Sequence, residues 1–156
     1  RMIDSKDELI LNILQENAKE SNASIGRQVH MAPSAVFERM RKLEARGVIH
    51  GYHTKLDPKA LGLGALAFVF LKMEIGSDPF RIDDRLREIP EIQEAYHIAG
   101  EDCYMIKIWA SDTDDLGNLL FEKIHPIKGI ISTRTTIVLK TVKQSSLLPV
   151  QRKEGD

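Results

Sequence analysis

The segment from Ser24 to Gly47 constrains the fold most, because it has the pattern of two short helices joined by a tight turn. Ile25 and Val29 lie one helical turn apart in the first helix. Pro33 suits the first position of the second helix, where no backbone N–H is needed, and Gly47 suits its left-handed end. Two helices around a turn of three or four residues make a helix-turn-helix, whose second helix typically enters the major groove of DNA. The sequence therefore predicts a DNA-binding unit.

The predicted second helix, residues 33–46, has an apolar face and a polar face. Val36, Met40 and Leu43 recur at helical spacing and form a stripe that can pack against the rest of the unit. The residues that we expect to contact DNA are Ser34, Ala35, Glu38, Arg39, Arg41, Lys42 and Arg46. Those early in the helix are placed for base edges, and the basic ones suit base edges or phosphates. Arg39 lies nearer the apolar stripe, where a structural ion pair is an equal alternative.

The distribution of charge supports this interpretation, whereas the net charge of −1 does not bear on it. Residues 24–59 hold seven lysines and arginines against three acidic residues, and residues 60–156 hold twelve against fifteen. A local positive excess is what phosphate binding requires, because the release of counterions drives nonspecific affinity. The solvated face of an ordinary surface helix has a similar composition, so the basic residues alone leave that alternative open.

A further helix is expected before this pair, and linker signals follow it. Asp4 or Ser5 can cap a helix that ends between residues 17 and 22, and its apolar stripe is Leu9, Ile10, Ile13 and Leu14. Residues 48–56 have the pattern of a small β-ribbon or wing, and prolines and glycines mark a linker beyond it. We expect a helix-turn-helix domain over 1–50, a β-ribbon and hinge over 51–62, a second domain over 63–144 and a tail over 145–156.

The second half of the chain alternates strand-like and helical segments. The strand-like segments are 65–75, 92–99, 104–110 and 130–142, and the helical segments are 79–89 and 112–123. This βαββαβ order predicts an α+β ferredoxin-like domain, an antiparallel four-stranded sheet with both helices on one face. Because segment 65–75 is apolar in both registers, the open face of the sheet needs a cover, and we expect a second copy of the chain to supply it.

Several other classes of protein lack support in the sequence. Cys103 is the only cysteine, so an internal disulfide cannot form, and His97 and His125 lack neighbours at metal-ligand spacing. The longest apolar run, residues 61–71, is too short to span a bilayer, and no signal peptide is visible, so we expect a cytoplasmic protein with no membrane partner. No nucleophile motif, phosphate-binding loop or metal cluster appears, so an enzyme, although ferredoxin-like domains can host one, is not expected, nor is a cofactor or metal.

Taken together, these motifs resemble the Lrp/AsnC family, the leucine-responsive or feast/famine transcription regulators of bacteria and archaea. The resemblance spans Ile3-Asp4, Ala32-Pro33-Ser34, residues 38–44, Gly47-Val48-Ile49, Gly51-Tyr52, Gly100-Glu101 and residues 142–145. It implies a regulator that binds double-stranded DNA in the prokaryotic cytoplasm, in association with the nucleoid. It also implies homodimers that assemble into tetramers or octamers, and an amino-acid effector that changes the assembly or its DNA contacts.

The resemblance also implies an effector site near one loop, between dimers. The matching residues are Gly100, Glu101, Asp102, Cys103 and Tyr104. Gly100 permits a turn whose exposed N–H groups bind a carboxylate, and Glu101 or Asp102 suits an ammonium group, although an ordinary acidic hairpin loop has the same pattern. The chain departs from the family at Cys103, where aspartate is frequent, at His30, where glycine is frequent, and at Ala32, where a capping serine is common.

Two further functions share parts of this pattern. A ligand-insensitive architectural DNA-binding protein would keep the helix-turn-helix and use the sheet domain only for assembly. A pure amino-acid-binding module would show no salt-dependent affinity for DNA. Titration of amino acids against DNA binding separates the three.

Overall fold

The computed structural model describes residues 3–150, which divide into two compact units. The first unit contains the described residues up to Lys55 and those from Lys143 onward, and the second contains Leu56–Val142. The chain therefore passes between the units twice, and the segment after Val142 belongs to the same unit as the N-terminal helices. Within residues 3–150, no helix is long and apolar enough to cross a membrane.

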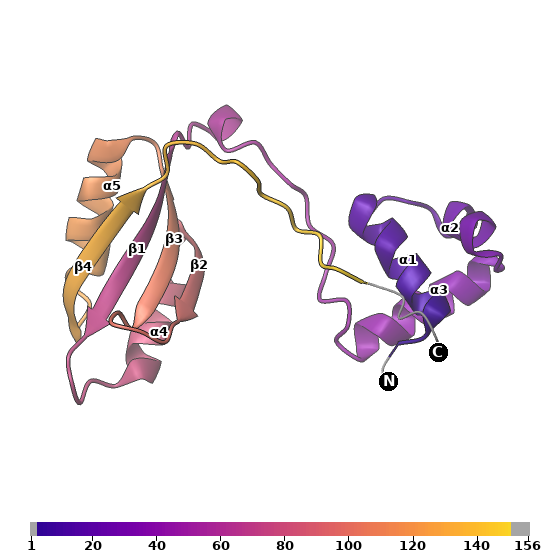
Figure 1. Ribbon diagram of the computed structural model, residues 1–156, viewed down its shortest axis with the longest axis horizontal. Coiled ribbons are helices and arrows are strands. Elements are labelled where there is room, and N and C mark those ends of the chain that lie inside the picture. The colour runs from indigo at the N-terminus through magenta and orange to yellow at the C-terminus, as the bar shows by residue number, and fades with distance from the viewer. Residues whose placement is uncertain (1–2, 151–156) are drawn as a thin grey trace. The chain divides into compact units, whose positions relative to one another are not determined.

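The first unit contains the predicted three helices, α1 (Ser5–Glu16), α2 (Asn22–Val29) and α3 (Pro33–Ala45) (Figure 1). Asp4 and Asp7 form a reciprocal capping box at the start of α1, and Ser21 caps α2. The first helical residue of α3 is Pro33, as expected. The apolar side chains that the three helices bury together are Ile10, Leu14, Ile25, Val29 and Val36.

The C-terminal segment lies along α1 in this unit. The side-chain amide of Gln15 exchanges two hydrogen bonds with the backbone of Leu148, at 3.0 and 2.7 Å. The amide of Asn12 donates to the carbonyl oxygen of Val150 at 3.0 Å. These contacts hold residues 148–150 against the helix without forming regular structure.

The β-ribbon predicted over residues 48–56 does not form, and this expectation was wrong. The segment contains no strand or bridge, and residues 50–57 are exposed. The backbone N–H groups of Val48 and Ile49 both donate to the carbonyl oxygen of Leu43, so they close the end of α3 instead of pairing with a strand. Ile49 packs on the helical core, and Tyr52 donates a hydrogen bond to Glu44 at 2.8 Å. The alternation of apolar residues therefore reflects packing onto the helices.

The second unit has the predicted βαββαβ order. Its strands are β1 (Ala65–Met73), β2 (Ile92–His97), β3 (Tyr104–Ala110) and β4 (Ile130–Ile137), and its helices are α4 (Pro79–Arg87) and α5 (Thr113–Leu119). A 3₁₀ turn (Lys59–Leu61) precedes β1, and a π-helical turn (Leu120–Ile124) extends α5. The strands pair antiparallel in the order β2-β3-β1-β4, which is the ferredoxin-like arrangement.

The two faces of this sheet differ in what covers them. Val69 and Leu71 of β1 and Ile106 of β3 point into the core with Ile82 of α4 and Leu119 of α5. Both helices lie behind the sheet in Figure 1, so no helix of the described residues covers the opposite face, which is called the uncovered face below.

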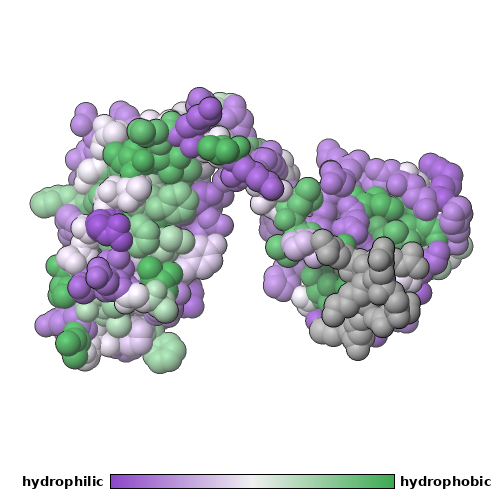
Figure 2. Space-filling model, viewed as in Figure 1, coloured by the Kyte–Doolittle hydropathy of each residue, from purple (hydrophilic) through white to green (hydrophobic). Residues whose placement is uncertain are grey.

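The uncovered face carries the second apolar register of β1. Leu66 pairs with Trp109 across the β1–β3 ladder, and Phe70 pairs with Met105. Figure 2 shows apolar residues among polar ones on this side of the sheet. The expected apolar open face is therefore present, and the register of β1 and β3 produces it.

Candidate DNA interface and effector loop

The turn between α2 and α3 depends on two residues with special backbone requirements. His30 adopts the left-handed conformation, with φ 59° and ψ 51°, which favours glycine. The N–H of Met31 donates to the carbonyl oxygen of Gly26 at 2.9 Å, and a Cβ atom on Gly26 would lie 2.4 Å from the oxygen of Met31. The backbone of the turn can therefore lie directly against α2 because residue 26 has no side chain.

The packed face of α3 is the one that the spacing predicted. Val36 and Leu43 are buried, and Met40 is half-buried against the same core. On the remaining faces, the exposed candidates are Ser34, Arg41, Lys42 and Arg46, whereas Ala35 and Glu38 are half-buried. Ala32 precedes the helix and makes no side-chain capping bond, so the first turn of α3 has no side-chain cap.

Arg39 ties α3 to α1 and does not share the exposed face. Its guanidinium donates to Asp4 at 2.7 Å and to Asp7 at 3.0 Å. The hydrogen bond from Arg39 is the largest cause that holds the pKa of Asp4 below its usual value. The structure thus supports the alternative that the sequence left open for Arg39, a structural ion pair.

Arg41 is paired within its own helix. Its Nε donates to one carboxylate oxygen of Glu38 at 3.1 Å and its Nη2 to the other at 2.6 Å. This hydrogen bonding lowers the pKa of Glu38, so the carboxylate is charged at neutral pH. The pair presents both a cation and an anion on the exposed side of α3, with about half of each side chain open to solvent.

Phe37 is an exposed residue of α3 that the sequence reasoning did not single out. The side chain is 58% exposed, although its neighbour Val36 is completely buried. The signal was available in the sequence, because residue 37 is three positions after Ser34 and four before Arg41, which places it on their side of the helix. The polar residues of this face were predicted as DNA contacts, whereas the exposed aromatic residue among them was not.

The loop from Gly100 to Tyr104, where the sequence predicts the effector site, places one of its acidic residues against a basic partner. The carboxylate of Asp102 accepts a hydrogen bond from Nη2 of Arg134 at 2.8 Å. The guanidinium of Arg134, on β4, lies 4.2 Å from the centre of the Phe70 ring, on the uncovered face of the sheet. Gly100 has φ 140°, a conformation that favours glycine, and Glu101 is exposed.

Cys103 and Tyr104 lie on the core side of the same loop. Cys103 is half-buried against the core, and its N–H donates to the carbonyl oxygen of Leu71 at 2.9 Å. Tyr104 is 2% exposed, and its hydroxyl donates to Asp83 of α4 at 2.7 Å. The five predicted effector residues therefore do not all face the same way. Asp102 is hydrogen-bonded to β4, and Tyr104 is hydrogen-bonded to α4.

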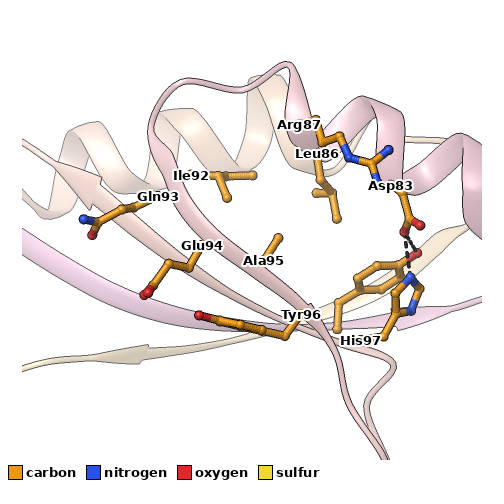
Figure 3. Close-up of a pocket in the computed structure, with 10 residues that line it drawn as sticks. Asp83, Leu86, Arg87, Ile92, Gln93, Glu94, Ala95, Tyr96 and His97 are labelled. Carbon is orange, nitrogen blue, oxygen red and sulfur yellow. Dashed lines mark hydrogen bonds and ion pairs between the residues drawn. The ribbon is translucent and has the colours of Figure 1, made fainter. Parts of the chain in front are cut away.

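A pocket of about 340 Å³ lies between α4 and the edge strand β2 (Figure 3). At one end, Nε2 of His97 and the hydroxyl of Tyr104 both reach Oδ1 of Asp83, at 2.8 and 2.7 Å. The hydrogen bond from Tyr104 is the largest cause that lowers the pKa of Asp83, and burial raises the pKa of Tyr104. No group of residues in the described part of the chain could hold a metal ion.

Each of the two units matches a domain of known proteins. Residues 3–44 match the AsnC-type helix-turn-helix domain, and residues 66–148 match the Lrp/AsnC ligand binding domain. The HTH-type transcriptional regulator FL11 of Pyrococcus horikoshii is 36% identical over 149 residues, covering 96% of this chain and 97% of its own. The leucine-responsive regulatory protein of Escherichia coli is 33% identical over 151 residues, covering 96% and 92%.

Solved structures give the same result. A transcriptional regulator from Neisseria meningitidis in complex with L-Met has a TM-score of 0.90 at 26% identity, covering 95% of this chain and 97% of that one. AsnC of Escherichia coli has a TM-score of 0.87 at 30% identity, covering 93% and 97%. The chain therefore belongs to the Lrp/AsnC family, as a transcriptional regulator with a helix-turn-helix DNA-binding domain and a ligand-binding domain, and it is not an enzyme.

Proposed function

We propose that the chain is an amino-acid-responsive regulator that binds specific DNA sites as a homo-oligomer, in the prokaryotic cytoplasm and at the nucleoid. The main observation in support of an amino-acid response is the ion pair of Asp102 and Arg134 beside the Gly100 turn. Nη2 of Arg134 lies 2.8 Å from a carboxylate oxygen of Asp102. The relative solved with L-Met and the relatives named leucine-responsive support the same class of effector.

The effector proposal follows from the charges of a free amino acid, which carries a carboxylate and an ammonium group. Arg134 and the N–H groups of the Gly100 turn bind the carboxylate, and Asp102 with the exposed Glu101 binds the ammonium. Cys103 supplies no charge where the family frequently has aspartate. Asp102 takes over that function in this proposal, and Cys103 and Tyr104 hold the loop on the core.

The DNA proposal assigns separate tasks to the residues of α3. Ser34, Ala35 and Glu38 lie in the first turns, which meet base edges in helix-turn-helix proteins. Arg41, Lys42 and Arg46 lie further along the helix and contact phosphates or base edges. Arg39 belongs to the DNA-binding set only through its support of the helix, because Asp4 and Asp7 engage its guanidinium.

The uncovered face of the sheet is the proposed dimer contact. Phe68, Phe70 and Trp109 are only half-buried there within one chain, and a second copy would complete their burial. A two-fold dimer presents two α3 helices, which fit major grooves about 34 Å apart on pseudo-palindromic sites. Association of these dimers gives the proposed tetramer or octamer.

A thermal-shift screen of the full chain against the twenty amino acids tests the effector proposal. A ligand at 100 times its dissociation constant stabilises the folded state by about 2.7 kcal/mol. We expect at least one amino acid to raise the melting temperature of the wild type and of the control Glu122→Gln, an exposed glutamate of the same unit outside the loop, and to have no effect on Asp102→Asn or Arg134→Gln. A normal response in both of these variants would remove the pair from the site.

The alternative of a ligand-insensitive architectural protein has one observation in its favour. Asp102 and Arg134 already satisfy one another, as a purely structural ion pair would. This alternative predicts that no amino acid changes either the melting temperature or the DNA affinity.

A further inference from the structure

We infer that Phe37 reads the C5-methyl group of a thymine in the major groove, and so sets part of the sequence preference. The inference rests on the proposed binding of DNA by α3 and adds a named residue and a named base to it. It starts from an exposed aromatic ring on the face that the helix-turn-helix presents to DNA.

The position of Phe37 places it among the expected DNA contacts. At about 100° per residue, Phe37 lies roughly 60° around the helix axis from Ser34 and roughly 40° from Arg41. At the same angle per residue, the buried residues Val36 and Leu43 lie roughly 100° and 120° from Phe37. Phe37 is thus early in α3, where base edges are met, and turned away from the core of its unit.

The chemistry of the neighbouring side chains selects what Phe37 meets. Arg41 gives this side of the helix a cationic group that matches the phosphates beside the groove. Within the groove, base edges are polar apart from the methyl group of thymine, which apolar side chains contact. A ring that is exposed beside a cation therefore fits a thymine methyl better than it fits the apolar surface of a protein partner.

Phe37 differs from its polar neighbours on this side of α3 because it offers no hydrogen bond. Glu38 holds Nε and one N–H of Nη2 of Arg41, so the guanidinium keeps its Nη1 edge for a phosphate or a polar base edge. Ser34 contributes a hydroxyl, which accepts or donates to several bases. Phe37 supplies the apolar contact in the first two turns that distinguishes thymine from cytosine at one position.

The test compares thymine with deoxyuridine, which differs only by the missing methyl group. A preferred site is first selected from random duplex DNA with the wild-type protein. Each thymine of that site is then replaced in turn by deoxyuridine, and the affinities of the wild type, Phe37→Ala and Phe37→Leu are measured. Phe80→Ala is the matched control, because Phe80 is also exposed near the start of a helix but belongs to the second unit.

We expect the replacement of one particular thymine, at the equivalent position of either half-site, to weaken wild-type binding by about three- to ten-fold. This is the contribution of one buried methyl group. The same replacement should not affect Phe37→Ala, and Phe37→Leu should retain part of the effect. The control Phe80→Ala should respond like the wild type. The melting temperature and the salt dependence of Phe37→Ala should stay unchanged, because the side chain is exposed and uncharged.

Three outcomes would overturn the inference while leaving DNA binding intact. In the first, the wild type and Phe37→Ala lose the same affinity at every replaced thymine. In the second, neither protein loses affinity at any replaced thymine. Phe37→Ala could instead change the oligomeric state, which would make Phe37 a protein contact. A wild-type protein without salt-dependent affinity for DNA would instead contradict the proposed function itself, so the two failures are distinguishable.

Discussion

At the scale of single residues, the helix-turn-helix depends on close contacts that polarity patterns do not reveal. Gly26 is required because the backbone of Met31 occupies the place of its Cβ atom. His30 fills a left-handed position where glycine is favoured, and histidine is tolerated there better than a β-branched residue. The sequence predicted a turn and its unusual histidine, but the close approach at Gly26 is visible only in three dimensions.

Two glycine substitutions should have opposite effects on stability. Gly26→Ala forces the backbone of Met31 to move and should lower the free energy of unfolding by about 1–3 kcal/mol, as overpacking does. Gly117→Ala in α5 meets nothing within 4 Å and should raise it by about 0.5–1 kcal/mol, because alanine favours a helix. Chemical denaturation of each variant measures both values. A neutral Gly26→Ala would show that the turn relaxes without cost.

The ion pair of Arg39 should make the first unit sensitive to acid. The folded-state pKa of Asp4 lies below its ordinary value of 3.8, so the stabilisation is complete above that value and is lost as the pH falls through the folded-state pKa. Denaturation of the wild type and Arg39→Gln between pH 6 and pH 2 should show a smaller acid-dependent loss in the variant. Arg87→Gln, which breaks an exposed pair with Asp84, is the control and should keep the wild-type profile. Identical profiles for all three would contradict this role for Arg39.

At the scale of elements, hydrophobic periodicity predicted every α-helix and strand of the sheet unit and where most of them begin. Most predicted segments extend past the observed ends, as the strand predicted over 130–142 does beyond Ile137. Strand β1 was predictable because both of its registers are apolar, one facing the helices and the other the uncovered face. The predicted β-ribbon failed because Val48 and Ile49 give their N–H groups to the end of α3. No sequence pattern predicts the hydrogen bond between Gln15 and the backbone of Leu148, because the two residues lie far apart in the chain.

The exposed basic residues of α3 should govern nonspecific affinity for DNA. Replacing Arg41 and Lys42 together by alanine should weaken binding to all sequences and flatten the slope of log affinity against log salt by about two. The control is Lys128→Ala with Lys140→Ala, which removes the same charge from exposed positions of the second unit. Fluorescence anisotropy over a range of salt concentrations measures the slopes. Equal slopes in the two double variants would remove this face from the DNA interface.

At the scale of the whole molecule, the uncovered face of the sheet should control assembly. Phe68→Asp places a charge among half-buried apolar side chains and should shift the protein toward monomers, because an unpaired charge is costly to bury. The monomer should also bind a two-half-site DNA more weakly, since it loses the effective concentration of the second reading helix. Light scattering gives the mass, and Phe121→Asp, at an exposed position outside the strands, is the control. An unchanged mass would place the contact elsewhere.

The sequence alone predicts only part of the candidate effector site. The sequence predicts an effector site in the loop from Gly100 to Tyr104, which stays a prediction, but it does not predict how these residues divide between the two sides of the sheet. Arg134 lies thirty-two positions from Asp102, so only the pairing of β1 with β4 and with β3 brings the two together. Lone residues on distant strands carry no spacing signal, and for this reason the basic partner of the site appeared only in the fold.

Ligand affinity and DNA affinity should be coupled in this protein, and a reciprocal titration measures that coupling. The affinity of the full chain for its selected DNA site is measured with and without the amino acid that stabilises it, and the affinity for the amino acid is measured with and without DNA. Because linkage is reciprocal, we predict that both ratios are equal and lie between about 5 and 150, in either direction. Ratios of one, with every one of the twenty amino acids, would contradict the account.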